Sequence, residues 1–367
     1  MTIPVALSTR ELAVFPADYS HAREELRLLA QRSPQVQDVL AFSVDGATGA
    51  DDEPLSTEII WLGPRSARNV VVLISATHGV EGFVGAAVQT DLMLRLEQGY
   101  DLPGDTAVLI IFALNPYGFS RCRRCDEAGI DLNRNFVDFD SPLPANDGYE
   151  RLQQAIYCED SAQRHSLFEA FRERWGQAAF EVAISGGQYT DPYGPFYGGR
   201  DPAHGHKVIE RLIEHYQLAR PRLAVIDIHS GLGPYAHGEL INDHPLDSAG
   251  FHLANRWYGA SAASPAAGDS SSVIKLGLLD YRWHALMAEH GCYVTLEFGT
   301  YRTRDLFDAV LQDHRSWKSG DPRAIRSSAA AMKAHFCPAD VYWRELVLIK
   351  ARQVIQQAID GLVHDRQ

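Results

Sequence analysis

The feature that most constrains the fold of this chain is a set of four near-continuous apolar runs. They cover residues 70–76, 106–114, 223–228 and 292–298, and β-branched side chains are frequent in them. A strand with one face in water alternates apolar and polar residues, whereas a strand buried on both faces reads as an unbroken apolar run. Helical stretches separate these runs. The sequence therefore predicts one α/β domain over residues 1–367, with a mixed, largely parallel central sheet flanked by helices.

Helical periodicity and turn signals predict further elements between and beyond the four runs. These are helices at 19–32, 149–175, 204–216, 245–258 and 341–363, and strands at 36–44, 56–62 and 238–241. The Gly- and Tyr-rich segment 185–202 is interpreted as an ordered rim beside a site. The small, polar segment 261–272 is expected to be a mobile loop.

Charge and cysteine content exclude some partners and favour a compartment. The formal net charge is −13, and no basic stripe is present, which argues against nucleic acid as a partner. No apolar run approaches the length of a membrane span, and residues 1–16 lack the pattern of a signal peptide. Five cysteines form a sparse, odd-numbered set that suits reduced thiols. We expect a cytoplasmic protein without a membrane or nucleic-acid partner.

A candidate metal ligand pair follows the first apolar run. The turn Thr77-His78-Gly79-Val80-Glu81-Gly82 places an imidazole and a carboxylate three residues apart at the end of a strand. Ligands in open α/β sheets bind at the carboxyl ends of strands, and this donor pair is of the type that binds zinc. The spacing alone is weak, because His21 and Glu24 repeat it inside an amphipathic helix, where an exposed polar face is the simpler interpretation.

Two further polar side chains lie at the ends of later apolar runs. His229 ends the third run, and Glu297 lies within the end of the fourth. A lone histidine or glutamate at such a position is usually structural, but a buried charge is rarely kept unless it is paired or metal-bound. Three protein ligands and one water make a catalytic zinc site. His78, Glu81 and His229 supply this set for one zinc ion per chain, which leaves Glu297 free as a general base.

Several arginines follow the second apolar run. Arg121, Arg123 and Arg124 precede the segment Gly129-Ile130-Asp131-Leu132-Asn133-Arg134-Asn135. A solvated basic loop is one interpretation. The other is a substrate site, because arginine binds a carboxylate or a developing oxyanion in two-pronged geometry.

The order of these motifs resembles the zinc carboxypeptidase (M14) metallopeptidase superfamily. The motifs are His-x-x-Glu, Asn-Pro-x-Gly, Asp-Leu-Asn-Arg-Asn, a later His and a late Glu. The wording of Thr-His-Gly-Val-Glu-Gly, Asp-Ile-His-Ser-Gly-Leu-Gly-Pro-Tyr and Leu-Glu-Phe-Gly-Thr is similar to an uncharacterised bacterial branch, the DUF2817 group. The resemblance spans residues 70–301, so that 1–68 and 340–367 are expected to be family-variable extensions.

The resemblance implies a role for each matching residue. His78, Glu81 and His229 would bind zinc, and Glu297 would act as general base and then as proton shuttle to the leaving amine. Arg124, with Arg123 as its near rival, would polarise the scissile carbonyl, and Asn133 and Arg134 would clamp a free carboxylate. Asp131 would orient His78. Tyr281, at a poorly matching spacing, would be the substrate-closing tyrosine.

The implied function is zinc-dependent cleavage of an amide or peptide bond in a small molecule or short peptide with a free carboxylate. One alternative is an N-acyl amino acid deacylase similar to aspartoacylase and desuccinylase enzymes, since a related branch of the fold removes acyl groups. Another is a metal- or carboxylate-binding protein without turnover. The oligomeric state and the substrate are not determined by the sequence.

Two minor alternatives concern other reactive side chains. His237 and Glu239 are close enough to His229 in sequence to be rival ligands or substrate contacts. Cys122 and Cys125 form a Cys-x-x-Cys pair that a thiol oxidoreductase would use, although no second cysteine pair accompanies them. Incidental pairing is the simpler interpretation of these two cysteines.

Overall fold

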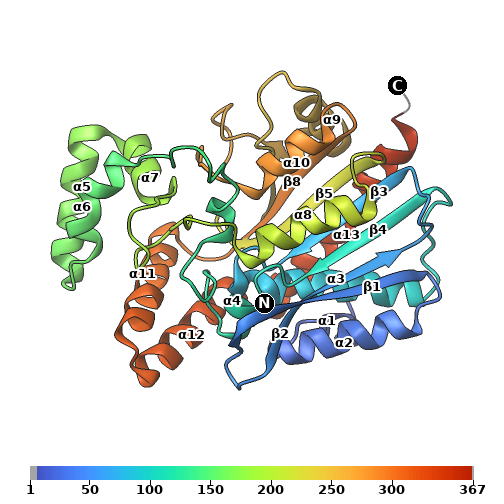
Figure 1. Ribbon diagram of the computed structural model, residues 1–367, viewed down its shortest axis with the longest axis horizontal. Coiled ribbons are helices and arrows are strands. Elements are labelled where there is room, and N and C mark those ends of the chain that lie inside the picture. Colours follow the sequence, from blue (N-terminus) through green and yellow to red (C-terminus); the bar gives the residue numbers. More distant parts are fainter. Residues whose placement is uncertain (1–5, 366–367) are drawn as a thin grey trace.

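The computed structural model describes residues 6–365 and is built around one eight-stranded sheet (Figure 1). The strand order is β1-β2-β4-β3-β5-β8-β6-β7. Strands β4, β3, β5 and β8 are parallel to one another, and β6 is parallel to β7, whereas the pairs β1–β2, β2–β4 and β6–β8 are antiparallel. The predicted mixed, largely parallel sheet is confirmed. The strands are β1 (Val36–Thr48), β2 (Pro54–Leu62), β3 (Asn69–Ser75), β4 (Thr106–Phe112), β5 (Arg222–Gly231), β6 (Gly238–Ile241), β7 (Ala262–Ala263) and β8 (Gly291–Gly299).

The apolar runs form the centre of this sheet because both of its faces are covered. Successive side chains of a strand point to opposite faces. On β3, Val71 and Leu73 join the larger hydrophobic core, whereas Val70, Val72 and Ile74 join a second core on the other face. Polar residues at any of these positions would be buried without partners, which explains why the runs are unbroken.

Helices form a layer on each face of the sheet (Figure 1). Helices α2, α3 and α13 contribute to the larger core, and α8 and α10 contribute to the second. The α-helices are α1 (Thr9–Leu12), α2 (Tyr19–Arg32), α3 (Gly82–Glu97), α4 (Pro116–Ser120), α5 (Asp147–Ile156), α6 (Ser161–Trp175), α7 (Gln177–Ser185), α8 (His204–Tyr216), α9 (Ala249–Tyr258), α10 (Leu279–Met287), α11 (Thr303–Ser319), α12 (Pro322–Phe336) and α13 (Val341–His364). Among the described residues, every helix is too short or too polar to traverse a lipid bilayer.

Helices α5, α6 and α7 form an arm, residues 147–185, that projects from the sheet beside α11 (Figure 1). The arm packs against α11 around a third hydrophobic core, which includes Tyr149, Phe168 and Phe180 of the arm and Leu311 of α11. The prediction of one helix over 149–175 is wrong. The chain breaks after Ile156, and Asp160 then caps α6 by accepting hydrogen bonds from the backbone N–H groups of Ala162 and Gln163.

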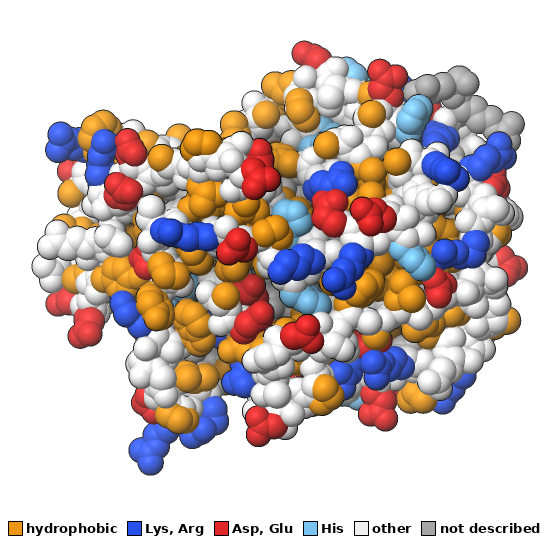
Figure 2. All heavy atoms as spheres, viewed as in Figure 1, with side chains coloured by type: hydrophobic (Ala, Val, Ile, Leu, Met, Phe, Trp, Pro, Cys, Tyr) orange, Lys and Arg blue, Asp and Glu red, His pale blue; other side chains and the backbone are white. Residues whose placement is uncertain are grey.

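The face of the molecule drawn in Figure 2 carries charges of both signs. Lys and Arg side chains are interspersed with Asp and Glu side chains over the sheet-covering helices and the arm. Recognition of a charged substrate therefore depends on local groups rather than on a surface of one sign.

Candidate metal centre

The turn that carries His78 is fixed by close backbone packing. Ala76 has a left-handed φ of 57°, which turns the chain sharply out of β3. A Cβ atom at Gly79 would lie 2.1 Å from the carbonyl carbon of Gly118, so only glycine fits there. The N–H of Gly79 donates to the carbonyl of Arg124 at 3.1 Å. The His78 turn and the loop of residues 121–135, here called the arginine loop, are thereby held together.

His229 and Glu297 are brought side by side by the sheet. Strands β5 and β8 are parallel, and their register makes His229 and Glu297 direct neighbours. Both residues lie at the carboxyl ends of their strands, the same edge of the sheet at which β3 ends. Parallel strands place these ends together, as the positions of the polar residues in the sequence predicted.

Three ligand atoms converge at this edge. His78 Nδ1 lies 2.9 Å from Glu81 Oε1, and His229 Nδ1 lies 2.9 Å from Glu81 Oε2. The two nitrogens are 3.1 Å apart. His78, Glu81 and His229 together form a buried group whose ligand atoms all lie within 4.8 Å of one another. Two imidazole nitrogens and one carboxylate are the donor set of catalytic zinc sites, so the residues present fit a zinc ion.

The ring nitrogen opposite each ligand atom faces a further carboxylate. His78 Nε2 lies 3.3 Å from Asp131 Oδ1, and His229 Nε2 lies 2.7 Å from Asp227 Oδ2. Metal-binding histidines commonly direct their second nitrogen to such a carboxylate, which fixes the ring and its tautomer. Asp227 also accepts hydrogen bonds from the hydroxyls of Thr77, at 2.8 Å, and Tyr293, at 2.9 Å.

The charges of this cluster shift one another's pKa values. Burial lowers the pKa of His229, but the negative charges of Asp227 and Glu81 outweigh burial and raise that pKa well above its usual value. Burial raises the pKa of Glu81, and the neighbouring His78 and His229 lower it well below its usual value. The cluster therefore keeps the Glu81 carboxylate ionised, as metal ligation requires.

Glu297 is the carboxylate beside the cluster that is not one of the three ligands. Its Oε1 accepts a hydrogen bond from the backbone N–H of Leu232 at 2.9 Å. Burial, followed by the negative charge of Glu81, raises the pKa of Glu297 to about 7. A carboxylate with such a pKa beside a metal site is suited to accept and return a proton near neutral pH.

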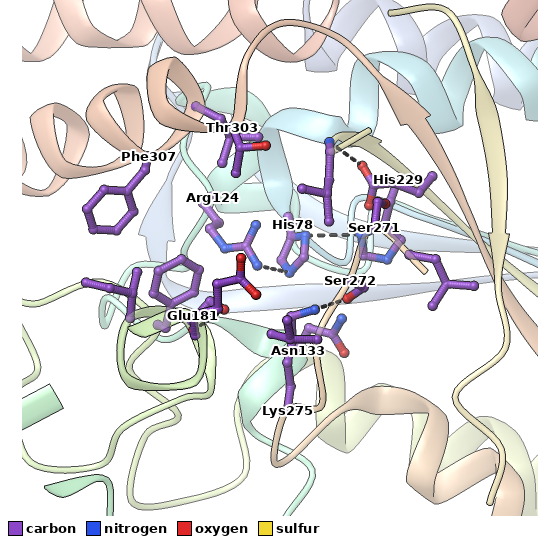
Figure 3. A pocket seen from close by; sticks show the side chains of 18 of the residues that line it. His78, Arg124, Asn133, Glu181, His229, Ser271, Ser272, Lys275, Thr303 and Phe307 are labelled. Carbon is purple, nitrogen blue, oxygen red and sulfur yellow. Dashed lines mark hydrogen bonds between the residues drawn. The ribbon is translucent and has the colours of Figure 1, made fainter. Parts of the chain in front are cut away.

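A cavity of about 840 Å³ opens onto the cluster (Figure 3). It is lined by the three proposed metal ligands, by the proposed general base and by three predicted substrate contacts. The predicted residues at this cavity are His78, Glu81, His229, Glu297, Arg124, Asn133 and Arg134.

The two rival arginines are separated by their partners. Arg124 is buried at the cavity, where its Nε donates to Asp131 at 2.8 Å and its Nη2 lies 2.7 Å from His78 Nε2. Arg123 points away from the cavity. Its Nε donates to Asp313 at 3.0 Å, and its guanidinium stacks 4.3 Å from the ring centre of Trp317. The prediction of Arg123 as a substrate contact is therefore corrected: this side chain is buried in packing between the arginine loop and α11.

Asn133 and Arg134 are held in fixed orientations at the cavity. Asn133 Oδ1 accepts from the backbone N–H of Leu279 at 2.9 Å, and within residues 6–365 its amide nitrogen has no protein acceptor. Arg134 Nη2 donates to the carbonyl of Ser185 at 2.7 Å, and Nη1 donates to the carbonyl of Asn133. A guanidinium has five N–H groups, so donors remain for a ligand.

Tyr281 is not placed as predicted, and a lysine occupies that side of the cavity instead. The Tyr281 hydroxyl donates to the backbone carbonyl of Lys275 at 2.6 Å, and the residue does not line the cavity. Lys275 does line it, and burial together with the charge of Arg134 lowers the pKa of its ammonium to about 8. Figure 3 shows Lys275 and Asn133 reaching the cavity from the same side.

The minor alternatives lie outside the metal cluster. His237 is exposed, and Glu239 accepts hydrogen bonds from the Ser270 hydroxyl at 2.7 Å and the Ser271 N–H at 3.0 Å. Glu239 thus attaches the predicted mobile loop to the sheet. Burial raises the thiol pKa of Cys122 to about 11 and raises that of Cys125 further, which is opposite to the shift of a reactive thiol.

Two features of the site were missed by sequence reasoning. Asp227 lies two residues before His229, and residues two apart on a strand share a face, so this spacing could have indicated the pair. Lys275 follows the small, polar segment 261–272, and nothing in its local sequence indicates that it reaches the cavity.

Comparison with solved structures found related arrangements of the chain at low sequence identity. Carboxypeptidase A from Helicoverpa armigera is 16% identical, with a TM-score of 0.46 over 87% of this chain and 74% of that one. A metallo-carboxypeptidase from Burkholderia cenocepacia is 13% identical, with a TM-score of 0.45 over 94% and 70% of the two chains. An aspartoacylase family protein from Mesorhizobium loti is 13% identical, with a TM-score of 0.38 over 77% and 67%.

A search of curated proteins found no match to this chain. One protein-family model does match, and it spans residues 15–350, which include the metal cluster, the arginine loop and the arm. The predicted relationship to this group is confirmed, and the chain belongs to the family described as "Protein of unknown function (DUF2817)".

Proposed function

We propose that this protein is a zinc-dependent hydrolase that cleaves an amide bond in a small substrate with a free carboxylate. The observation that carries the proposal is the convergence of His78, Glu81 and His229 beside Glu297, a fourth carboxylate that is not needed as a ligand. A site that only bound a metal would have no use for a buried carboxylate with a raised pKa at the mouth of the cluster.

Zinc bound by the three ligands would lower the pKa of a water molecule and polarise the scissile carbonyl. Glu297 accepts the proton of the attacking water on its carboxylate and later gives it to the leaving nitrogen. The backbone N–H of Leu232 holds Oε1 of Glu297, so the carboxylate stays aimed at the cavity through both transfers. A pKa of about 7 suits both steps.

Arg124 is assigned to the oxygen of the scissile carbonyl. A neutral imidazole has one N–H and one lone pair. With His78 Nδ1 on the metal, Nε2 must carry the hydrogen, and its acceptor is Asp131. Arg124 Nη2 is also a donor, so the protonated Nε2 of His78 cannot accept a hydrogen bond from it. Nη2 then turns to the cavity. Its Nε remains bonded to Asp131, which keeps the guanidinium in place.

Asn133 and Arg134 are assigned to the free carboxylate of the substrate. Both side chains are anchored by backbone groups and keep N–H donors for the cavity. A carboxylate held there fixes the distance to the bond that is cleaved, and such positioning is a large part of catalysis. Lys275 is placed to add a third donor.

The test measures metal content and hydrolysis on the same preparations. We expect about one zinc per chain in the wild type and in Glu297→Gln, with a kcat for N-acyl amino acids that falls on the order of 1,000-fold in the variant. Mass spectrometry of the purified protein and a fluorometric assay of released amino acid measure the two quantities. Unchanged hydrolysis in Glu297→Gln would contradict the assignment of Glu297 as general base, and a zinc-loaded wild type that hydrolyses none of these compounds would favour the alternative of a binding protein without turnover.

A further inference from the structure

We propose that the arm, together with Phe196 and with Phe307 of α11, forms an apolar annex of the cavity, and that this annex binds an alkyl or aromatic acyl group on the carbonyl side of the scissile bond. The apolar annex consists of Phe168, Phe180, Ile184, Phe196 and Phe307. The inference deepens the proposed function, on which it rests, by naming the class of acyl group that the enzyme removes.

The annex is the cavity-facing edge of the third hydrophobic core. Phe168 stands at the centre, with T-shaped contacts to Phe180 at 5.3 Å and to Phe307 at 5.8 Å between ring centres. These residues belong to the third hydrophobic core, yet they also line the cavity. Helices α6, α7 and α11 therefore present aromatic rings to the cavity rather than closing it with polar groups.

Phe196 connects the annex to the metal centre. Its ring lies 5.2 Å from the guanidinium carbon of Arg124 and 5.6 Å from that of Arg134. The same ring packs in the arm's core. A substrate whose carbonyl oxygen meets Arg124 thus has an apolar surface directly beside that contact.

The annex lies on the Arg124 side of the cluster. In Figure 3, Phe307 lies beyond Arg124 as seen from His78, whereas Ser271 and Ser272 lie on the other side of the opening. Phe196 lies against both Arg124 and Arg134, so it borders the carbonyl and the free carboxylate of the substrate. The side toward Phe307, which lies beyond Arg124 and away from Asn133, takes the acyl part.

The outer rim of the annex is polar. Arg172 lies over Phe180, with 3.8 Å from its guanidinium carbon to the ring centre, and pairs with Glu169. Glu181 also lines the cavity. An apolar floor with a charged rim is typical of a pocket that takes an apolar group from water.

The size of the cavity supports an acyl group of several carbons. Pockets of about 300–1,000 Å³ enclose drug-sized ligands, and this one measures about 840 Å³. An acetylated amino acid would leave the annex empty, so its apolar walls would contribute nothing to binding. In the reaction, the acyl C–N bond breaks, water supplies hydroxyl to the acyl carbon and hydrogen to the nitrogen, and a carboxylic acid and an amine are released.

The experiment compares octanoate with acetate as ligands of the zinc-loaded protein by titration calorimetry. Each buried methylene strengthens binding by about fourfold, so burial of roughly three or four of the extra methylenes of octanoate should make it bind on the order of 100-fold more tightly than acetate. Phe307→Ala should weaken octanoate binding roughly tenfold and leave acetate unchanged. Phe171→Ala is the matched control, because Phe171 packs partly buried against the same core and does not line the cavity.

Hydrolysis assays distinguish an alkyl from an aromatic acyl group, and they distinguish a failure of the annex proposal from a failure of the hydrolase proposal. N-octanoyl-alanine and phenylalanyl-alanine, each against N-acetyl-alanine, show whether an alkyl or an aromatic group is preferred. Equal affinity for octanoate and acetate, or equal effects of Phe307→Ala and Phe171→Ala, would overturn the annex while leaving the hydrolase standing. An octanoate preference without hydrolysis of any compound would leave the annex standing and contradict the hydrolase.

Discussion

Two pairs of histidines lie ring against ring within residues 6–365, and they differ in what surrounds them. His78 and His229 meet with ring centres 4.7 Å apart, and carboxylates face all of the ring nitrogens. His244 and His284 stack at 3.7 Å with no carboxylate bonded to either ring within residues 6–365. Instead, His244 Nε2 accepts a hydrogen bond from the backbone N–H of Tyr293 at 2.9 Å.

The surroundings give the two pairs opposite properties. Carboxylates raise the pKa of His229 well above its usual value, whereas burial lowers the pKa of His244 to about 4. Burial and the neighbouring ring lower the pKa of His284 to about 2. The first pair is arranged to hold positive charge, which a metal ion supplies, and the second is arranged to stay neutral and to support β8. Proximity of two histidines is thus not the property that makes a metal site.

The sharpest way to break this comparison is to remove one histidine from each pair. We expect His78→Ala to lose bound zinc and all hydrolysis, because two ligands rarely retain the ion. His244→Gln should keep about one zinc per chain, since its ring is not a ligand. Mass spectrometry of the metal content and circular dichroism of folding measure both. Zinc retained in His78→Ala, or lost from folded His244→Gln, contradicts the assignment.

Neutralising a carboxylate partner should have a smaller effect. Asp227→Asn keeps the shape but removes the negative charge opposite the metal-binding nitrogen of His229. Such outer partners change metal affinity by about 10–100-fold, and we expect a loss in that range from competition with a zinc chelator. Asp51→Asn, at an exposed carboxylate, serves as control. Wild-type affinity in Asp227→Asn would show that ring orientation does not depend on this contact.

The neutral pair predicts a loss of stability in acid. In the folded state His244 titrates at about 4, below its unfolded value near 6.5, so unfolded chains bind more protons as the pH falls. The stabilisation is present above pH 6.5 and is lost progressively down to about pH 4, by on the order of 2 kcal/mol for this group.

The acid effect is measured by urea unfolding at pH 7.0, 5.5 and 4.5. His284→Phe keeps a ring against His244 and removes one titrating group, so its stability should fall less steeply with pH than that of the wild type. Parallel pH profiles for the two proteins would show that this pair does not contribute to acid sensitivity.

The smallest effect is expected at the second His-x-x-Glu segment. His21 and Glu24 are exposed on α2. A combined His21→Ala and Glu24→Gln variant should bind zinc as the wild type does, and its unfolding free energy should change by less than about 1 kcal/mol. Chelator competition and urea unfolding test this. A loss of zinc would mean that the His-x-x-Glu spacing is sufficient for zinc binding without a position at the end of a strand.

The sequence predicted the sheet and the convergence of His78, His229 and Glu297 for one physical reason. Unbroken apolar runs identify strands buried on both faces, and parallel strands bring their carboxyl ends to one edge. Residues at those ends could be placed without any knowledge of contacts. The sequence did not show that the helix expected over 149–175 breaks, because the break depends on a local cap at Asp160.

The substrate side of the site was less accessible to sequence reasoning. Arg123 and Arg124 are adjacent, and their different roles depend on Asp313, a residue 190 positions away in the chain. Lys275 reaches the cavity from a loop that Glu239 attaches to the sheet through serine side chains. Such pairings depend on the tertiary structure, and a single sequence contains no record of them.

The arm is one continuous segment of the chain, and the residues that lead into it and out of it are hydrogen-bonded to each other beside the metal cluster. Asp131 N–H donates to the carbonyl of Tyr197 at 2.7 Å, and the Asn135 amide donates to the carbonyl of Gly198 at 2.8 Å, so the outgoing and returning segments are tied together. Insertions, deletions and sequence drift between these ties would alter the annex walls formed by Phe168, Phe180, Ile184 and Phe196, whereas Phe307 on α11, the proposed metal ligands and Glu297 lie outside this segment. Within one family, substrate choice can therefore diversify by exchange of a single continuous segment while the chemistry stays constant.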